Sequence, residues 1–152
     1  YVGAHSEVEM KEKKDRVDDA LQATKAAVEE GIIPGGGVAF LRSFKILNKL
    51  EGLSNDENIG IDIIKKAIQA PLRTIIDNAG EDAGYIISKV FEGDNDYGYN
   101  ARSGKFENLI SSGVIDPAKV ARVALENAAS IAGMLLTTEC VISKNLNKTN
   151  QN

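Results

Sequence analysis

The sequence has few residues that could hold a small fold together through disulfides or metal ions. Its 152 residues include one cysteine, Cys140, and one histidine, His5. A single cysteine cannot form an internal disulfide, and His5 has no metal-ligand partners at a useful spacing, so neither a disulfide scaffold nor a zinc site is expected. This cysteine usage suits a reducing compartment, and Cys140 is predicted to be a small buried apolar residue.

Long apolar runs and basic patches are also missing. The longest apolar runs are only a few residues long, which predicts a soluble protein without a membrane-spanning segment. The formal net charge is -4, and acidic and basic residues are mixed along the chain. Because no basic patch could follow a phosphate backbone, nucleic acid is not expected as a partner.

Two common ion-binding and phosphate-binding motifs are absent as well. No GxxxxGK[ST] stretch occurs, so the chain has no P-loop. The acidic run DNDYGYN, residues 94–100, fails as a calcium loop because its sixth position is Tyr99 and its twelfth is Lys105. The chain begins at Tyr1 without a signal or transit pattern, and we expect Tyr1 to be an internal cut or a processed end.

The apolar residues that are present recur mostly with helical spacing, which predicts a mainly α domain with one small hairpin. The first helix has Met10, Val17, Leu21, Thr24 and Val28 on one face. Helices are predicted over residues 10–30, 36–50, 59–78 with an interruption at Pro71, 81–91 and 116–138. Residues 51–58 are predicted to be a loop, a hairpin is predicted to turn at Ser103-Gly104, and strand fragments are predicted near residues 1–8 and 140–143.

Three consecutive glycines, Gly35, Gly36 and Gly37, stand where the second helix must begin. Glycine costs backbone entropy in a helix, so the triplet suggests that a ligand approaches the main chain closely at a helix N-terminus. The structural alternative, which the pattern alone favours, is a loop with unusual dihedral angles or tight packing against another helix. Gly31 should stop the preceding helix and Pro34 prevents its continuation, so residues 31–34 are a candidate hinge.

Three polar residues are further candidates, each with a plain structural alternative. Asp19 lies on the outer face of the first helix and could activate a water molecule, or be one of many solvated charges. Asn100 in YGYNAR could contact a flat ligand such as a base, or serve the turn. Asp116, before Pro117, is expected to cap the last helix, and its second oxygen could bind a ribose.

Several long stretches together resemble the group I chaperonins, the large ring-forming heat-shock proteins of bacteria and organelles. These stretches cover nearly all of residues 2–142 in order, and they are VGAHSEVEMKEKKDRVDDALQATKAAVEEGIIPGGGVAFLR, APLRTIIDNAG, YGYNARSGKFENLISSGVIDPAKVARVALENAASIAG and LLTTECVI. The resemblance implies a subunit of an ATP-driven ring that encloses unfolded proteins and assists their folding.

The resemblance also implies a domain assignment. Residues 1–30 correspond to the C-terminal part of the intermediate domain, including its long helix, and residues 31–143 to the C-terminal half of the equatorial ATP-binding domain. Residues 144–152 are expected to be a disordered polar tail. The partners it implies are identical subunits in heptameric rings, unfolded substrates and the small co-chaperonin, in a bacterial cytoplasm, a mitochondrial matrix or a plastid; neither nucleic acid nor a membrane is implied.

Carried over position by position, the resemblance assigns roles to the candidate residues. Asp19 matches the aspartate that activates the attacking water, and Gly31 matches the lower hinge. The positions expected to bind ATP are Gly35, Gly36, Asn100, Ala101, Arg102 and Asp116. Among these, Gly36 would touch the nucleotide through its main chain, Asn100 and Ala101 would contact the adenine, and Asp116 would accept the ribose hydroxyls.

Departures from the family pattern limit these expectations. Arg102 stands where many relatives have a small residue, Pro34 stiffens the exit from the hinge, and the tail lacks Gly-Gly-Met repeats. The phosphate loop, the Mg²⁺-binding aspartate and the apical domain have no counterpart in these 152 residues, so the isolated chain is expected to be inactive as an ATPase. A nucleotide-independent helical interaction module of the same descent, and an unrelated enzyme using Asp19 and Asp116 as an acid/base pair, are the alternatives.

Overall fold

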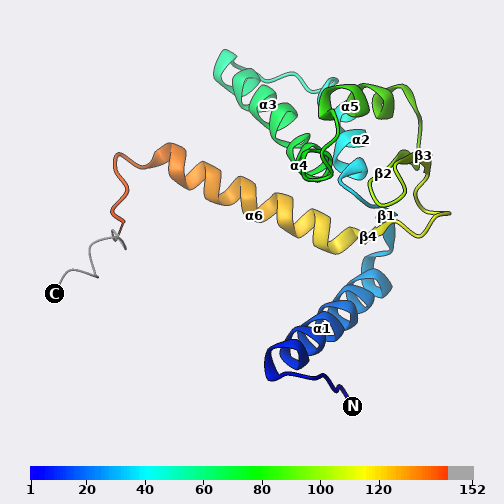
Figure 1. Cartoon of the computed structure of the whole chain (residues 1–152). Coiled ribbons are helices and arrows are strands. Elements are labelled where there is room, and N and C mark those ends of the chain that lie inside the picture. Colours follow the sequence, from blue (N-terminus) through cyan, green and yellow to red (C-terminus); the bar gives the residue numbers. More distant parts are fainter. Residues whose placement is uncertain (144–152) are drawn as a thin grey trace. The chain divides into compact units, whose positions relative to one another are not determined.

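The computed structural model describes residues 1–143 and confirms a mainly α fold (Figure 1). Its elements are α1 (Glu7–Glu30), β1 (Ile32–Pro34), α2 (Val38–Leu47), α3 (Asn55–Ala67), α4 (Ala70–Asn78), α5 (Ala83–Glu92), β2 (Tyr97–Asn100), β3 (Lys105–Asn108), β4 (Ile115–Pro117) and α6 (Ala118–Thr137). The chain forms two units, Tyr1–Val120 and the part from Ala121 onward. The expected tail, residues 144–152, lies outside the described residues.

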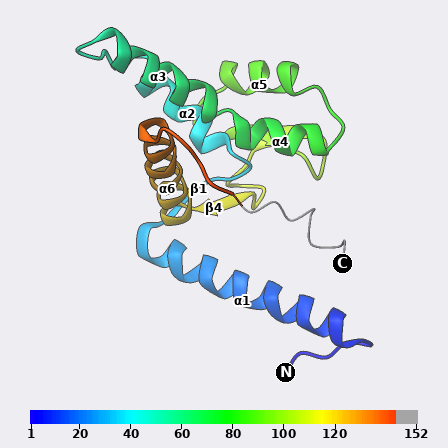
Figure 2. The same ribbon diagram turned by 90° about the vertical axis from the view of Figure 1, so that its left-hand side faces the viewer.

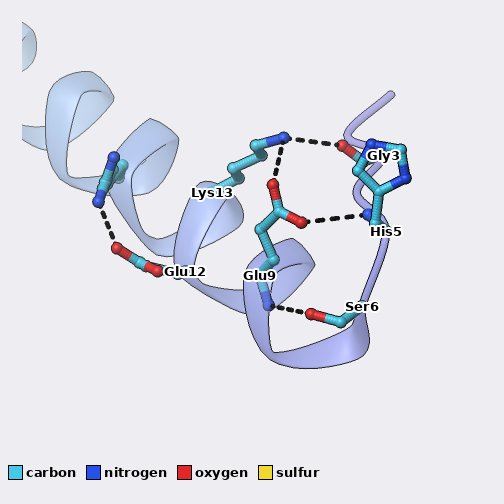
Figure 3. A network of polar contacts seen from close by, with 7 residues as sticks. Gly3, His5, Ser6, Glu9, Glu12 and Lys13 are labelled. Atoms are coloured by element: carbon cyan, nitrogen blue, oxygen red, sulfur yellow. Dashed lines mark hydrogen bonds and ion pairs between the residues drawn. The ribbon is translucent and has the colours of Figure 1, made fainter.

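Helix α1 begins at a side-chain cap that the sequence analysis did not identify (Figure 3). Ser6 Oγ accepts a hydrogen bond from the Glu9 N–H at 3.2 Å, and the Glu9 carboxylate accepts one from the His5 N–H. Lys13 pairs with Glu9 at 3.1 Å and donates to the Gly3 carbonyl. This Ser-x-x-Glu start signal explains why the helix begins at Glu7, so the prediction of a strand fragment over residues 1–8 is wrong.

The end of α1 agrees with its prediction. Gly31 has a φ of 84°, and its N–H donates to the Ala27 carbonyl at 2.8 Å. The apolar residues predicted to share one face of α1 remain largely exposed, from 42% for Met10 to 83% for Val28. In the described structure, α1 therefore contributes no buried residue to the core.

A two-stranded antiparallel sheet follows α1, and the sequence analysis missed it (Figure 2). Strand β1 pairs with β4 so that Ile33 lies opposite Asp116, and the Ala118 N–H donates to the Gly31 carbonyl at 3.1 Å. The expectation that Asp116 and Pro117 form the start of the last helix is wrong, since both lie in β4 and α6 begins at Ala118. Strands of three residues are too short to show an alternating pattern.

The core of the first unit lies where α2, α4 and α5 meet the β2–β3 hairpin. Its most fully buried side chains are Val38, Leu41, Leu72, Ile76, Val90 and Leu109. Phe44 of α2 and Phe91 of α5 meet edge to face, with ring centroids 5.2 Å apart. Burial of these side chains holds α2 against the hairpin. The candidate site is formed by residues next to these two elements.

Proline and serine set the boundaries of α3 and α4. Pro71 occupies the first turn of α4, so the helix predicted over residues 59–78 is divided there as expected. Helix α3 begins at Asn55, earlier than predicted, because Ser54 Oγ accepts a hydrogen bond from the Glu57 N–H at 3.2 Å. The predicted 51–58 loop is correspondingly shorter.

The predicted hairpin is confirmed. Strands β2 and β3 pair so that Gly98 lies opposite Glu107 and Asn100 lies opposite Lys105. Gly104 adopts a φ of 68° in the turn, which favours glycine. The Phe106 ring lies between those of Tyr97 and Tyr99, with centroids 6.0 and 5.2 Å away, and holds one face of the hairpin together.

Helix α6 is apolar and has no buried residue. It is 20 residues long, and an 18-residue window within it has a mean hydropathy of 1.2, so the helix is long and apolar enough to cross a membrane by length and composition alone. The expectation that the chain has no membrane-spanning segment stays a prediction, because the core helix of a soluble protein passes the same test. No strand forms over residues 140–143, and Cys140 is exposed, contrary to both predictions.

Candidate functional site

Each of the three glycines before α2 has a different structural environment, which explains why glycine is found there. Gly35 is buried, and its N–H donates to the Val114 carbonyl at 2.9 Å. Gly37 has a φ of +79°, and a Cβ there would lie 2.7 Å from the main-chain nitrogen of Leu72. Tight packing and unusual dihedral angles thus account for Gly35 and Gly37 without a ligand.

Gly36 is the exception within the triplet. It also has a left-handed φ, +65°, but a Cβ built there would have no atom within 4 Å. Open space therefore adjoins its main chain, which leaves room for another molecule to lie against this turn at the start of α2.

Asp116 of β4 reaches the same turn. The Gly36 N–H interacts with its carboxylate, which by itself lowers the pKa of Asp116. Partial desolvation of the carboxyl has the larger effect, and the net result is a pKa above the ordinary aspartate value. The residue as a whole stays exposed, so the carboxylate remains accessible from solvent.

Asn100 ends β2 with a side chain whose polar atoms are engaged. Its Oδ1 accepts hydrogen bonds from the main-chain N–H groups of Arg102 and Ser103, at 3.0 and 3.4 Å. Its Nδ2 donates to Glu107 Oε1 at 2.6 Å. The turn interpretation of Asn100 is therefore correct, and one N–H of the amide is left for a further partner.

Gly98 allows the hairpin to pack close to the glycine turn, which is formed by Gly35, Gly36 and Gly37. A Cβ at Gly98 would lie 2.8 Å from Val38 Cγ2 and 2.5 Å from Leu109 Cδ1, so β2 packs directly against the first residue of α2. The Val114 N–H donates to the Leu109 carbonyl at 2.8 Å, which ties the chain leading into β4 to the same place. The segments that carry Gly36, Asn100 and Asp116 consequently meet around Val38 and Val114.

The sequence analysis did not identify Val114 or Arg42 as part of this arrangement. Val114 carries no polar side chain, so no pattern pointed to it. Arg42 interrupts the apolar run AFLRSF, a signal that could have been used. Its guanidinium donates to the carbonyl oxygens of Val90, Gly93, Asn95 and Tyr97, and so fixes the loop that leads into β2. Partial burial lowers the pKa of Arg42.

Three other predicted positions are placed differently. Ala101 is partly buried against the core, whereas the Arg102 side chain is exposed at the turn. Asp19 is exposed on α1, twelve residues before Gly31, which is roughly 18 Å along a helix. Because Gly31 adjoins the β1–β4 sheet, the described structure does not bring Asp19 together with Asp116, and the acid/base-pair alternative has no geometric support.

The grouped residues offer complementary polar chemistry to a ligand. Main-chain groups next to open space lie at Gly36, a carboxylate acceptor lies at Asp116, and a donor N–H lies at Asn100. Hydroxyl groups suit the carboxylate, and the amide N–H suits an acceptor nitrogen of a ring. Among residues 1–143, no group of three or more His, Cys, Asp or Glu side chains could hold a metal ion.

Comparison with known proteins places this arrangement in a family. Residues 1–145 match the TCP-1/cpn60 chaperonin family. The crystal structure of a group III chaperonin in the open state is similar, with a TM-score of 0.77 and 27% sequence identity. That match covers 93% of this chain and 30% of the other, so the chain spans less than a third of that chaperonin. With a match over nearly its whole length, the chain belongs to the TCP-1/cpn60 chaperonin family.

Proposed function

We propose that this chain is part of a subunit of an ATP-dependent ring chaperonin of group I, which encloses unfolded proteins and assists their folding. Membership of the chaperonin family supports the ring and the ATPase, since members of this family are generally ATP-dependent. The group I assignment rests on the long sequence stretches that resemble the heat-shock chaperonins of bacteria and organelles. The heptameric ring, the small co-chaperonin and a bacterial or organellar compartment belong to the same proposal.

The adenosine part of ATP is proposed to bind between the Gly36–Asp116 contact and the end of β2 that carries Asn100. The contact between the Gly36 N–H and the Asp116 carboxylate carries this proposal, because it places a ribose acceptor next to an accessible main chain. Asn100 and Ala101, followed by Arg102, lie on the hairpin that Gly98 packs against α2. The base would contact this hairpin while the ribose contacts Asp116.

Asp19 and Gly31 are proposed to act in the hydrolytic step. Asp19 would position the attacking water, and it stands on the other side of Gly31 from the nucleotide-binding residues. Rotation at Gly31 would therefore be needed to bring the Asp19 carboxylate over bound ATP, as in enzymes whose closure completes the site. The φ of 84° at Gly31 is one that glycine adopts without strain.

Phosphate and Mg²⁺ binding are assigned to parts of the subunit beyond these 152 residues. The described residues supply no metal-binding cluster. ATP hydrolysis needs the metal and charged groups around the γ-phosphate, so the isolated chain is proposed to lack ATPase and refolding activity. The activity belongs to the complete subunit.

Equilibrium binding of ATP to the complete subunit tests the proposal. Asp116→Ala removes the ribose acceptor and is expected to weaken ATP binding by about tenfold or more, the effect of a lost charge-assisted hydrogen bond. Asp77→Ala, which removes an exposed carboxylate from α4, is the matched control and should bind ATP like the parent. Equal affinities for the parent and Asp116→Ala would contradict the assignment of the site.

A further inference from the structure

Glu107 faces Asn100 on one surface of the β2–β3 hairpin. Gly98 lies opposite Glu107 and Asn100 lies opposite Lys105. Side chains alternate between the faces of a strand, so Gly98, Asn100, Lys105 and Glu107 share one face and the aromatic residues share the other. The contact of Gly98 with Val38 identifies the first face as the one turned toward the start of α2, where the glycine turn lies.

The contacts of Asn100 allow a single orientation of its amide. Oδ1 receives two main-chain N–H groups, and Nδ2 donates to the Glu107 carboxylate. Exchanging the positions of the two amide atoms would set Nδ2 against the two N–H donors and Oδ1 against a carboxylate that only accepts. Glu107 therefore fixes the orientation of the Asn100 amide, with Nδ2 toward the Glu107 carboxylate and Oδ1 toward the two main-chain N–H groups.

The Glu107 carboxylate is itself held in place. It is half-buried, and Oε1 also receives the Ser103 hydroxyl at 3.4 Å. Gly98, which lies opposite Glu107, has no side chain that could push the Glu107 side chain away. Asn100 lies diagonally across the strand pair from Glu107, a distance that a long side chain such as glutamate can reach. Both Asn100 and Glu107 are thus ordered before any ligand arrives.

We propose that Glu107 is a positioning residue for base recognition, which holds the Asn100 amide so that its remaining N–H is presented to an acceptor nitrogen of the nucleotide base. This inference rests on the proposed function of the site. Since the two lone pairs of Oδ1 are occupied, Asn100 acts toward the base as a donor. Glu107 acts through Asn100 and supplies neither phosphate nor ribose contacts.

Two variants of the complete subunit separate this role from a general loss of structure. Glu107→Ala is expected to raise the Kd for ATP about fivefold to tenfold, as one misplaced hydrogen bond would. The Kd for inorganic tripolyphosphate and the kcat at saturating ATP should stay unchanged, because the phosphates and the reacting atoms are not involved. Glu107→Gln keeps an acceptor oxygen and should restore most of the affinity. Glu81→Ala removes an exposed carboxylate between α4 and α5 and serves as the charge control.

The side-chain amide NMR signals of Asn100 in the 152-residue chain give a second measurement that needs no nucleotide. One Nδ2 proton should resonate downfield in the parent and lose this shift in Glu107→Ala. The proposal is overturned if Glu107→Ala weakens ATP and tripolyphosphate equally, if ATP affinity does not change, or if the amide signal is the same in both proteins. A parent subunit that binds tripolyphosphate but not ATP overturns the proposed nucleotide site and with it the role of Glu107, even where the amide signal confirms the hydrogen bond.

Discussion

The main-chain N–H of Gly36 interacts with the carboxylate of Asp116 and so connects the turn before α2 to strand β4. The β1–β4 pairing holds both residues in register, with Ile33 opposite Asp116 and the Gly35 N–H bonded to the Val114 carbonyl. Two positions far apart in the sequence thereby form one polar corner. The strand pair that creates this corner also adjoins Gly31, so the candidate site and the candidate hinge share a support.

The raised pKa of Asp116 predicts a pH-dependent difference between the parent and Asp116→Asn. A carboxyl whose folded pKa exceeds its unfolded value contributes stability below the unfolded value, near 3.8, that is lost as the pH rises through the folded pKa. Asparagine has no charge to desolvate, and its oxygen can still accept from Gly36. The free energy of unfolding of the variant minus that of the parent should therefore increase from about pH 3 to about pH 6. Urea titrations at several pH values measure it, and a constant difference would contradict the desolvation of Asp116.

Neighbouring glycines in the triplet should respond differently to alanine. Gly36→Ala places a side chain at positive φ in open space and should cost about 1 to 2 kcal/mol of unfolding free energy. Gly37→Ala adds a collision with the main chain of Leu72 and should cost about 3 kcal/mol or more. Urea unfolding followed by circular dichroism gives both values. If Gly36→Ala proved the more destabilising, the open space beside Gly36 would be disproved.

Local sequence patterns predicted the helices and the hairpin, which are determined by residues close together in the sequence. They missed strands β1 and β4, whose hydrogen-bond partners are far away in the sequence. Helical periodicity and Gly31 indicated the end of α1, and Ser103-Gly104 indicated the hairpin. Strands β1 and β4 exist only because each completes the hydrogen bonds of the other, so three-residue stretches such as Ile32–Pro34 show no signal by themselves. The prediction that Cys140 is buried was wrong because burial also depends on which other segments are present to cover a residue.

The candidate site shows the same division. Asp116 and Gly36 were identified separately, by an Asp-Pro helix-start pattern and by a glycine pattern, but their contact follows from strand register, which the sequence did not predict. Asn100 was identified in the turn, whereas its partner Glu107 lies across the hairpin and needed the pairing to be known. Val114 acts through its main chain, so its side chain gave no sign of its position.

Gly98 is predicted to be required for the contact between the hairpin and α2. A Cβ at this position would lie 2.5 Å from Leu109 and 2.8 Å from Val38, both fully buried, so Gly98→Ala should cost about 1 to 3 kcal/mol. Gly60→Ala is the matched control within α3, where a Cβ meets nothing within 4 Å and helix propensity should add about 0.5 to 1 kcal/mol of stability. Chemical denaturation of both variants checks the signs, and a neutral Gly98→Ala would show that β2 does not pack on Val38.

Arg42 is predicted to stabilise the loop before the hairpin. Arg42→Met removes the guanidinium donors from four carbonyl groups between the end of α5 and the start of β2, at a cost of about 2 to 4 kcal/mol of unfolding free energy. Arg42→Lys should recover only part of this, because one ammonium cannot reproduce the planar arrangement of the guanidinium donors. Arg73→Met, at an exposed position of α4, is the control. Hydrogen exchange of the Tyr97 and Leu109 amides should accelerate in the Arg42 variants, and unchanged protection would show that Arg42 does not stabilise this loop.

The proposed role of Asp19 in hydrolysis, as distinct from nucleotide binding, can be tested by kinetics. If its carboxylate positions water only after rotation at Gly31, Asp19→Asn should lower the kcat of the complete subunit by about 100-fold or more. Its Kd for ATP should stay unchanged, because Asp19 lies on α1, apart from the nucleotide-binding residues. Asp18→Asn removes the neighbouring charge from the same helix and should retain the parent kcat. A loss of ATP affinity in Asp19→Asn without a loss of kcat would place Asp19 in nucleotide binding, and equal activity of both variants would remove it from the reaction.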